Sequence, residues 1–315
     1  MTGAGGIQLS RYAAIDIGSN AVRLLIANVI ESDDEVLFKK SSLIRVPVRL
    51  GVDAFLNKQI SGDNANRLIE AMKGFYHLMR ANQVIHYKGC ATSAMREAAN
   101  GPLIIERIRK EVGIDIEIIT GKKEAQIVYD THMEAQFEDV NDFLYVDVGG
   151  GSTEITHFYQ GSFNKSRSFN IGTLRLLENT VFESDWNVMK SWLADLEPTQ
   201  DDRCIIGLGG NINKMFKMSM KETGTPLTLN YLKKQYDSIS AMSYEKRIID
   251  LDLNPDRADV IVPALEIYIN LMKWSEIKSL YVPKIGLSDG IVRIAYAEHT
   301  QLKKPKRKVF KGTQE

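Results

Sequence analysis

The sequence has little cysteine, no excess charge of either sign and no long apolar run. Its 315 residues include only two cysteines, Cys90 and Cys204. Two thiols cannot form a disulfide framework in a chain of this length, so a reducing, cytoplasmic environment is expected. The 40 lysine and arginine residues balance 40 aspartate and glutamate residues. No global basic field would therefore attract nucleic acid.

Membrane and familiar nucleotide-binding signals are also missing. No apolar run approaches the roughly 18 residues that cross a bilayer, and the N-terminus has no signal-peptide pattern. No Gly-x-x-x-x-Gly-Lys-Ser/Thr sequence occurs, and no Gly-x-Gly-x-x-Gly opens a helix after a strand. We therefore expect no membrane partner, and any phosphate must be held by another kind of local site.

Two segments of the chain carry nearly the same turn. The apolar run Tyr12 to Ile15 leads into Asp16-Ile17-Gly18-Ser19-Asn20, and the run Phe143 to Val146 leads into Asp147-Val148-Gly149-Gly150-Gly151-Ser152-Thr153. Glycine lets backbone N–H groups point at an anion, and the hydroxyl residues add donors. The pair predicts two phosphate-binding loops that face each other across a cleft between two lobes.

A third glycine turn follows another apolar run. Gly207-Leu208-Gly209-Gly210-Asn211 ends an expected strand and precedes an expected helix. Backbone N–H groups at a helix N-terminus bind phosphate readily. Gly209 and Gly210 therefore join the candidate phosphate-binding residues.

The two Asp-containing turns also bring carboxylates close to the expected anion. Asp16 and Asp147 stand where each strand ends, and Glu154 starts the strand after the second turn. Either aspartate alone could simply cap its turn. Carboxylates beside phosphate usually share a divalent cation, and Mg²⁺ bridges phosphate oxygens while keeping several waters. We predict Mg²⁺ or Mn²⁺ at Asp147 and Glu154, with Asp16 nearby.

Other candidate residues lie outside these turns. Glu124 stands in the first turn of an expected helix, where an acid also complements the helix dipole. Arg96 follows Thr92 and Ser93 at a strand-to-helix junction. This arginine is either a surface residue or a phosphate clamp that acts with the two hydroxyls.

Apolar periodicity predicts a mixed α/β fold. Strands are expected over residues 11–30 (as a hairpin), 36–48, 84–89, 114–119, 143–148, 154–159, 162–169, 203–208 and 279–283. Helices are expected over 65–79, 94–99, 103–111, 122–136, 174–193, 285–297 and, with breaks, 211–272. The segment 257–272 is apolar almost all round, and Pro263 should kink it or displace its start.

The repeat of turn and element order divides the chain into two domains, 1–127 and 128–300, followed by a basic tail, 301–315. The last helix could pack back on the first domain. The run Lys303-Lys304-Pro305-Lys306-Arg307-Lys308 is expected to be a solvated tail.

The motifs resemble, in order, those of the exopolyphosphatase / guanosine pentaphosphatase (Ppx/GppA) phosphatases of the actin-like ATPase superfamily. The matching segments are Ala14 to Asn20, Ala91 to Arg96, Ile119 to Ala125, Val146 to Glu154 and Gly207 to Gly210. The resemblance implies two actin-like (ribonuclease H-like) lobes with the active site in the cleft between them. It also implies removal of terminal phosphate from inorganic polyphosphate, or of the 5′ γ-phosphate from guanosine pentaphosphate (pppGpp).

The same resemblance assigns roles to individual residues. It makes Glu124 the glutamate that activates the attacking water, and it places Asp147 and Glu154 near the metal and that water. The remaining matched positions are those of phosphate binding: Gly18, Ser19, Asn20, Thr92, Ser93, Arg96, Gly149, Gly150, Gly151, Ser152, Thr153, Gly209 and Gly210.

The chain departs from the family pattern in three places. Lys123 replaces a usual acid, and it could lower the pKa of Glu124 or reach for phosphate. Asn211 stands where threonine is common. The sequence ends near residue 315, without the helical C-terminal domain of long members, so a short polyphosphate track is expected.

The resemblance leaves other functions open. The alternatives to hydrolysis are a kinase of the same superfamily and a non-catalytic sensor of polyphosphate or alarmone. Homodimerisation is compatible with the sequence.

Overall fold

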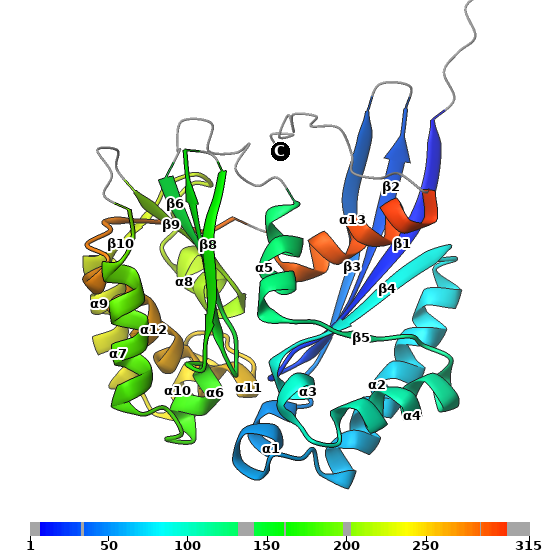
Figure 1. Cartoon of the computed structure of the whole chain (residues 1–315), viewed down its shortest axis with the longest axis horizontal. Coiled ribbons are helices and arrows are strands. Elements are labelled where there is room, and N and C mark those ends of the chain that lie inside the picture. Colours follow the sequence, from blue (N-terminus) through cyan, green and yellow to red (C-terminus); the bar gives the residue numbers. More distant parts are fainter. Residues whose placement is uncertain are drawn as a thin grey trace, which may run out of the picture.

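A computed structural model describes residues 7–32, 35–131, 142–160, 162–197, 203–283 and 285–300. It contains two sheets, each flanked by helices, which form two lobes side by side (Figure 1). The expected two-lobed α/β class is confirmed. The basic run 303–308 and residues 132–136 of an expected helix lie outside the described residues. No helix in the described ranges is both long and apolar enough to cross a membrane.

The first sheet has the strand order β3-β2-β1-β4-β5. The first three strands are antiparallel, and β4 and β5 run parallel to β1. Their bounds are β1 (Gln8–Ile17), β2 (Val22–Glu31), β3 (Val36–Val46), β4 (His86–Ala91) and β5 (Glu117–Ile118). One face packs on α2 (Gly62–Ala81) and α4 (Gly101–Val112), through a core that includes Ile15, Leu24 and Phe75.

The second sheet has the strand order β10-β11-β9-β6-β7-β8. Its strands are β6 (Asp142–Val148), β7 (Thr153–Tyr159), β8 (Ser162–Phe169), β9 (Cys204–Leu208), β10 (Leu227–Thr228) and β11 (Ser279–Tyr281). A large apolar core joins it to the surrounding helices. These are α6 (Thr173–Leu177), α7 (Glu183–Ala194), α8 (Gly210–Met218), α9 (Leu229–Ser240) and α12 (Ile261–Trp274).

Shorter helices complete the described part of the fold: α1 (Leu50–Asn57), α3 (Ser93–Glu97), α10 (Tyr244–Ile249) and α11 (Pro255–Ala258). Two longer helices link the lobes: α5 (Gly121–Tyr129) and α13 (Leu287–Thr300). The last helix α13 returns from the second sheet and lies across β1 and β4 of the first, beside α5 (Figure 1). The expected domain boundary at residue 127 falls inside α5.

The packing of α13 against α5 can be tested by a substitution at their contact. A Cβ on Gly290 of α13 would run into the carbonyl oxygen of Ile127 on α5. Because backbone must move to admit it, Gly290→Ala should lower the free energy of unfolding by about 1–3 kcal/mol. Gly74→Ala on α2 is the control, since nothing lies within 4 Å of its added methyl. That change should stabilise by about 0.5–1 kcal/mol. Equal denaturation curves for the two variants would contradict the contact.

Some elements differ from expectation for local reasons. Helix α1 was not expected. It begins after Arg49, which has a left-handed φ of 60° and whose side chain makes no capping hydrogen bond, so the usual sequence signal for a helix start is missing. Strand β5 is only two residues long, so most of 114–119 lies outside a regular strand. The expected helical region 211–272 divides into α8 to α12 and also contains β10. Pro263 lies in the first turn of α12, so the displaced start is confirmed.

Candidate active site

The two similar turns form hairpin loops of the same size. Ile17 pairs with Val22 around residues 18–21, and Val148 pairs with Thr153 around residues 149–152. Each loop is closed by one amide: Gly18 N donates to Ala21 O (3.2 Å), and Gly149 N donates to Ser152 O (2.9 Å). Among the described residues, no acceptor meets the amides at positions 19, 20, 150 and 151. Of these four residues, Ser19, Asn20 and Gly150 line the cavity described below, so their amides could bind a ligand.

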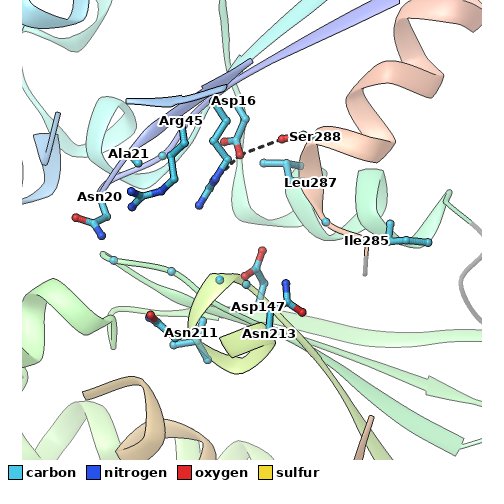
Figure 2. Close-up of a pocket in the computed structure, with 18 of the residues that line it drawn as sticks. Asp16, Asn20, Ala21, Arg45, Asp147, Asn211, Asn213, Ile285, Leu287 and Ser288 are labelled. Atoms are coloured by element: carbon cyan, nitrogen blue, oxygen red, sulfur yellow. Dashed lines mark hydrogen bonds and ion pairs between the residues drawn. The ribbon is translucent and has the colours of Figure 1, made fainter. Parts of the chain in front are cut away.

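The loops meet across the lobes. A Cβ on Gly150 would lie 3.1 Å from Cβ of Ser19, so the glycine permits the close approach. Helix α1 supports the first loop, since Gly51 N donates to Ser19 O (2.8 Å). Ser19 Oγ and Ser93 Oγ share a hydrogen bond of 2.8 Å, which ties that loop to α3. In Figure 2, Asp16 and Asn20 come from one side of the gap and Asp147 from the other.

A cavity of about 750 Å³ lies between the lobes. Its wall includes most of the sequence-predicted site: Asp16, Gly18, Ser19, Asn20, Thr92, Ser93, Glu124, Asp147, Gly149, Gly150, Ser152, Glu154, Gly209 and Gly210. Strand ends, two hairpin loops and the N-termini of α5 and α8 therefore converge on one space. Gly209 has φ of 104°, a backbone conformation that favours glycine, and this turn starts α8 at the cavity wall.

Three predicted phosphate-binding residues do not line the cavity. Gly151 is packed under the ring of Phe55, and Thr153 Oγ1 donates to the carbonyl of Ile171 at 2.6 Å. Arg96 Nη1 donates to Ile119 O at 2.8 Å. Burial raises the pKa of Glu124 and of Glu154, and the positive charge of Arg96 opposes that rise.

The cross-strand partners of the two aspartates carry opposite charges. Asp16 pairs in register with Arg23, whose Nη1 lies 2.6 Å from Asp16 Oδ2. Asp147 pairs in the same way with Glu154, another acid. Burial and the charge of Glu154 raise the pKa of Asp147 to about 7. The aspartate of the first turn therefore has an ion-pair partner, whereas among the described residues the two acids of the second turn form no ion pair.

Glu124 lies close enough to the other acids of the site to be affected by their charges. The hydroxyl of Thr120 caps α5 by accepting from Lys123 N (3.2 Å), which sets Glu124 one turn inside the helix. The side chain is buried, and Oε2 has no hydrogen-bond partner among the described residues. Burial, followed by the charges of Glu154, Asp147 and Asp16, raises the pKa of Glu124 well above its ordinary value. A buried carboxyl with a free oxygen suits a proton acceptor.

Lys123 takes neither of its expected roles. Its Nζ pairs with Glu117 on the outside of the protein, and it is absent from the cavity wall. It is also not a cause of the pKa shift of Glu124. Lys123 therefore lies outside the acid cluster of the cavity.

The residues at the second turn fit a divalent cation. In the described ranges, no group of three His, Cys, Asp or Glu side chains could hold a metal ion by itself. Mg²⁺ commonly uses one or two carboxylates and takes its other ligands from water and substrate phosphate. Asp147 and Glu154 offer carboxylate oxygens that repel each other, and Glu124 adds an oxygen, Oε2, that has no partner among the described residues. These residues would accept such an ion together with its phosphate.

The raised pKa of Asp147 predicts a pH dependence of metal-free stability. Because the folded pKa of about 7 exceeds the ordinary 3.8, the fold favours the protonated form. Its stabilising contribution is complete below the ordinary pKa and is lost as pH rises through about 7. The thermal midpoint should therefore fall between about pH 5 and about pH 8.5. Asp147→Asn should flatten this fall, and an unchanged profile in the variant would contradict the assignment.

Sequence reasoning missed the arginines of the cavity. Arg23, Arg45 and Arg257 all line it. Arg257 lies against the start of α8, where its Nη1 is 3.4 Å from Gly210 O. Burial and the positive charges of Arg45 and Arg23 lower its pKa. Three arginines that repel one another around a cavity favour an anion. The sequence held one signal for Arg23: pairing of the first hairpin places it opposite Asp16.

One of these arginines also joins the lobes. Arg45 on β3 forms an ion pair with Asp256 on α11. Asn20 of the first loop donates through Nδ2 to the Asp256 backbone carbonyl at 2.9 Å. Arg49 pairs with Asp259 at 2.5 Å. These contacts hold the first loop and α11 together on one side of the cavity.

Comparison with known proteins places this architecture in a family. Residues 29–298 match the Ppx/GppA phosphatase family. A bifunctional 3-dehydroquinate synthase/phosphatase of Fusobacterium nucleatum is 29% identical, over 79% of this chain and 41% of that protein. A guanosine-5′-triphosphate,3′-diphosphate pyrophosphatase of Vibrio atlanticus is 27% identical, over 89% and 58%. The chain thus spans only part of these relatives. Exopolyphosphatase 1 of Mycobacterium bovis is 22% identical, over 90% and 87%.

Solved structures agree with the fold. The Ppx/GppA protein of Aquifex aeolicus superposes with a TM-score of 0.73 at 25% identity, covering 94% of this chain and 99% of that one. An exopolyphosphatase from Cytophaga hutchinsonii gives 0.77 at 24% identity, covering 94% and 100%. These likenesses confirm the expected two-lobed actin-like fold. The chain belongs to the Ppx/GppA phosphatase family.

Proposed function

We propose that this protein hydrolyses a terminal phosphoanhydride bond and releases phosphate from short-chain inorganic polyphosphate. One observation carries the proposal. The buried, unpartnered carboxyl of Glu124 shares a cavity with two facing loops that have free amides and with three arginines. A proton acceptor and a polyanion site therefore occupy one space between the lobes. The names of the mycobacterial and Vibrio relatives are consistent with such chemistry.

In the proposed reaction the terminal phosphate lies between the two hairpin loops. The amides of residues 19, 20 and 150 and the arginines would neutralise its oxygens. Glu124 would orient a water molecule for in-line attack and take its proton. Mg²⁺ or Mn²⁺ held by Asp147 and Glu154 would, when bound, neutralise charge on the transferring phosphate and the leaving group. Most of the rate would come from positioning and charge stabilisation.

A second candidate substrate is pppGpp. The cavity continues along α8 and the turn that follows it, where Phe216 and Met220 line the wall together with Leu43 of β3. Apolar and aromatic side chains suit a nucleoside better than they suit an inorganic chain. Lys217, Lys221 and Lys40 also line the cavity and would contact further phosphates.

Two other functions would use the same cavity differently. A kinase would transfer the phosphate to an acceptor molecule, and a sensor would bind the substrate without hydrolysing it.

Side-by-side assays separate these functions. Phosphate release is measured with tripolyphosphate, long-chain polyphosphate, pppGpp and ATP in the presence of Mg²⁺. The proposal expects the highest kcat/KM for tripolyphosphate, and a preference for pppGpp would support the alternative. Phosphate transfer from ATP to an acceptor would indicate a kinase. Tight binding without phosphate release from any substrate would contradict hydrolysis. The cytoplasmic location and the homodimer stay predictions.

A further inference from the structure

A serine on the neighbouring strand fixes the carboxylate of Glu154. Ser168 of β8 stands directly opposite Glu154 of β7 in the strand register. Its Oγ donates to Glu154 Oε1 at 2.9 Å, and Ser152 Oγ donates to the same oxygen at 2.6 Å. Hydrogen bonds to a charged acceptor are stronger than neutral ones. Two such donors on one oxygen limit the rotation of the carboxylate.

The same serine also touches the helix that carries the proposed base. A Cβ built on Gly121, the first residue of α5, would lie 2.9 Å from Ser168 Cβ and 3.7 Å from Glu154 Oε1. Glu124 follows three positions later on that helix. Only a glycine on α5 and a small residue on β8 allow this approach. Ser168 therefore lies where the strand of Glu154 meets the helix of Glu124.

The separation of these two acids matters for the reaction. The charge of Glu154 is the largest electrostatic cause, after burial, of the raised pKa of Glu124. Both carboxyls line the cavity where the attacking water must stand. A displacement of about 1 Å at a reacting centre can reduce rates by about a hundredfold. A residue that sets this separation acts on turnover without touching the substrate.

We propose that Ser168 is a positioning residue for hydrolysis, which holds Glu154 against the first turn of α5 so that Glu154 and Glu124 share one water site. This inference rests on the proposed function, since it assigns Ser168 a part in the same reaction. Ser168 does not line the cavity, and no step of bond making or breaking passes through its hydroxyl.

The test compares Ser168→Ala with Ser166→Ala. Ser166 lies two residues earlier on β8, and its Oγ makes a similar hydroxyl contact with Thr156 Oγ1 at 2.8 Å, away from the cavity. Ser168→Ala should lower kcat about tenfold with unchanged KM. Ser166→Ala should leave both constants within about twofold. Thermal midpoints of the two variants are measured in parallel, because a merely structural role would lower the midpoint and leave kcat per folded molecule intact.

A second variant probes the same contact from the other side. Gly121→Ala pushes α5 away from Ser168 and should also lower kcat with little change in KM. If both residues set one geometry, the double variant Gly121→Ala/Ser168→Ala loses less than the product of the single losses. An active wild type with normal kcat in Ser168→Ala would overturn the inference and leave the proposed function standing. A wild type that releases no phosphate from any substrate would overturn both.

Discussion

Replacing Glu124 by glutamine is expected to lower kcat by about 10²–10⁴-fold while substrate binding is retained. The amide has nearly the shape of the carboxyl but cannot accept a proton from water. KM for tripolyphosphate should change little, because the free amides and arginines that would bind phosphate lie on other elements. The measurement is steady-state phosphate release together with direct binding of tripolyphosphate.

The physical state of Glu124 adds a second expectation for this variant. The carboxyl is buried beside other acids, and Oε2 has no partner among the described residues. Removing an ionisable carboxyl from this buried cluster of acids should leave the thermal midpoint at neutral pH unchanged or raise it. Loss of activity with higher stability would distinguish lost chemistry from lost folding.

Glu117→Gln is the matched control for this substitution. Glu117 lies on the preceding strand β5 and pairs with Lys123 and Lys88 at the surface. Exposed ion pairs contribute little, so its loss should change kcat by less than about twofold. Wild-type turnover in Glu124→Gln would exclude this residue as the base and favour a sensor or another proton acceptor.

Strand-and-glycine patterns predicted the frame of the site well. Apolar runs that end in Asp and glycine predicted two equivalent hairpins, and the register shows Ile17 opposite Val22 and Val148 opposite Thr153. Each turn follows from local sequence, because a strand, a tight loop and a returning strand need only neighbouring residues. The position of Glu124 at the same cavity does not follow from local sequence, because Glu124 is far from both hairpins along the chain. It was predicted from the resemblance to a family.

The orientation of side chains within the second loop could not be predicted from the sequence. Gly151 and Thr153 belong to the same motif as Gly150 and Ser152, yet they face the protein interior. Phe55 of the unexpected helix α1 covers Gly151, and Arg175 stacks on that ring at 4.0 Å. Packing from another lobe decides which residues of a tight turn meet the ligand.

The cationic part of the site was hidden for a related reason. Arg23, Arg45 and Arg257 lie far apart in the sequence and belong to no motif. Arg45 reaches the cavity because β3 pairs with β2, and Arg257 because α11 lies against the start of α8. Only the assembled lobes bring Arg45 and Arg23 close enough to lower the pKa of Arg257.

Replacing Arg257 by methionine is expected to lower kcat/KM for tripolyphosphate by about 10–100-fold, mainly through a higher KM. A hydrogen bond to a charged group contributes about 1.5–3 kcal/mol, which corresponds to that range. Methionine keeps much of the side-chain volume and removes the charge. The variant should bind tripolyphosphate more weakly in direct titration, and its affinity should depend less on salt concentration than that of the wild type.

The stability of the Arg257→Met variant decides how its loss of affinity is interpreted. Burial and the charges of Arg45 and Arg23 lower the pKa of Arg257, so this cation is held against repulsion in the free protein. Removing it should leave the thermal midpoint unchanged or higher, as expected of a residue retained for ligand binding. Lys246→Met on the neighbouring α10 removes an exposed cation outside the cavity, and it should alter neither KM nor stability. If Arg257→Met binds tripolyphosphate as the wild type does, the arginines do not form the anion site, and the free loop amides must hold the phosphate without them.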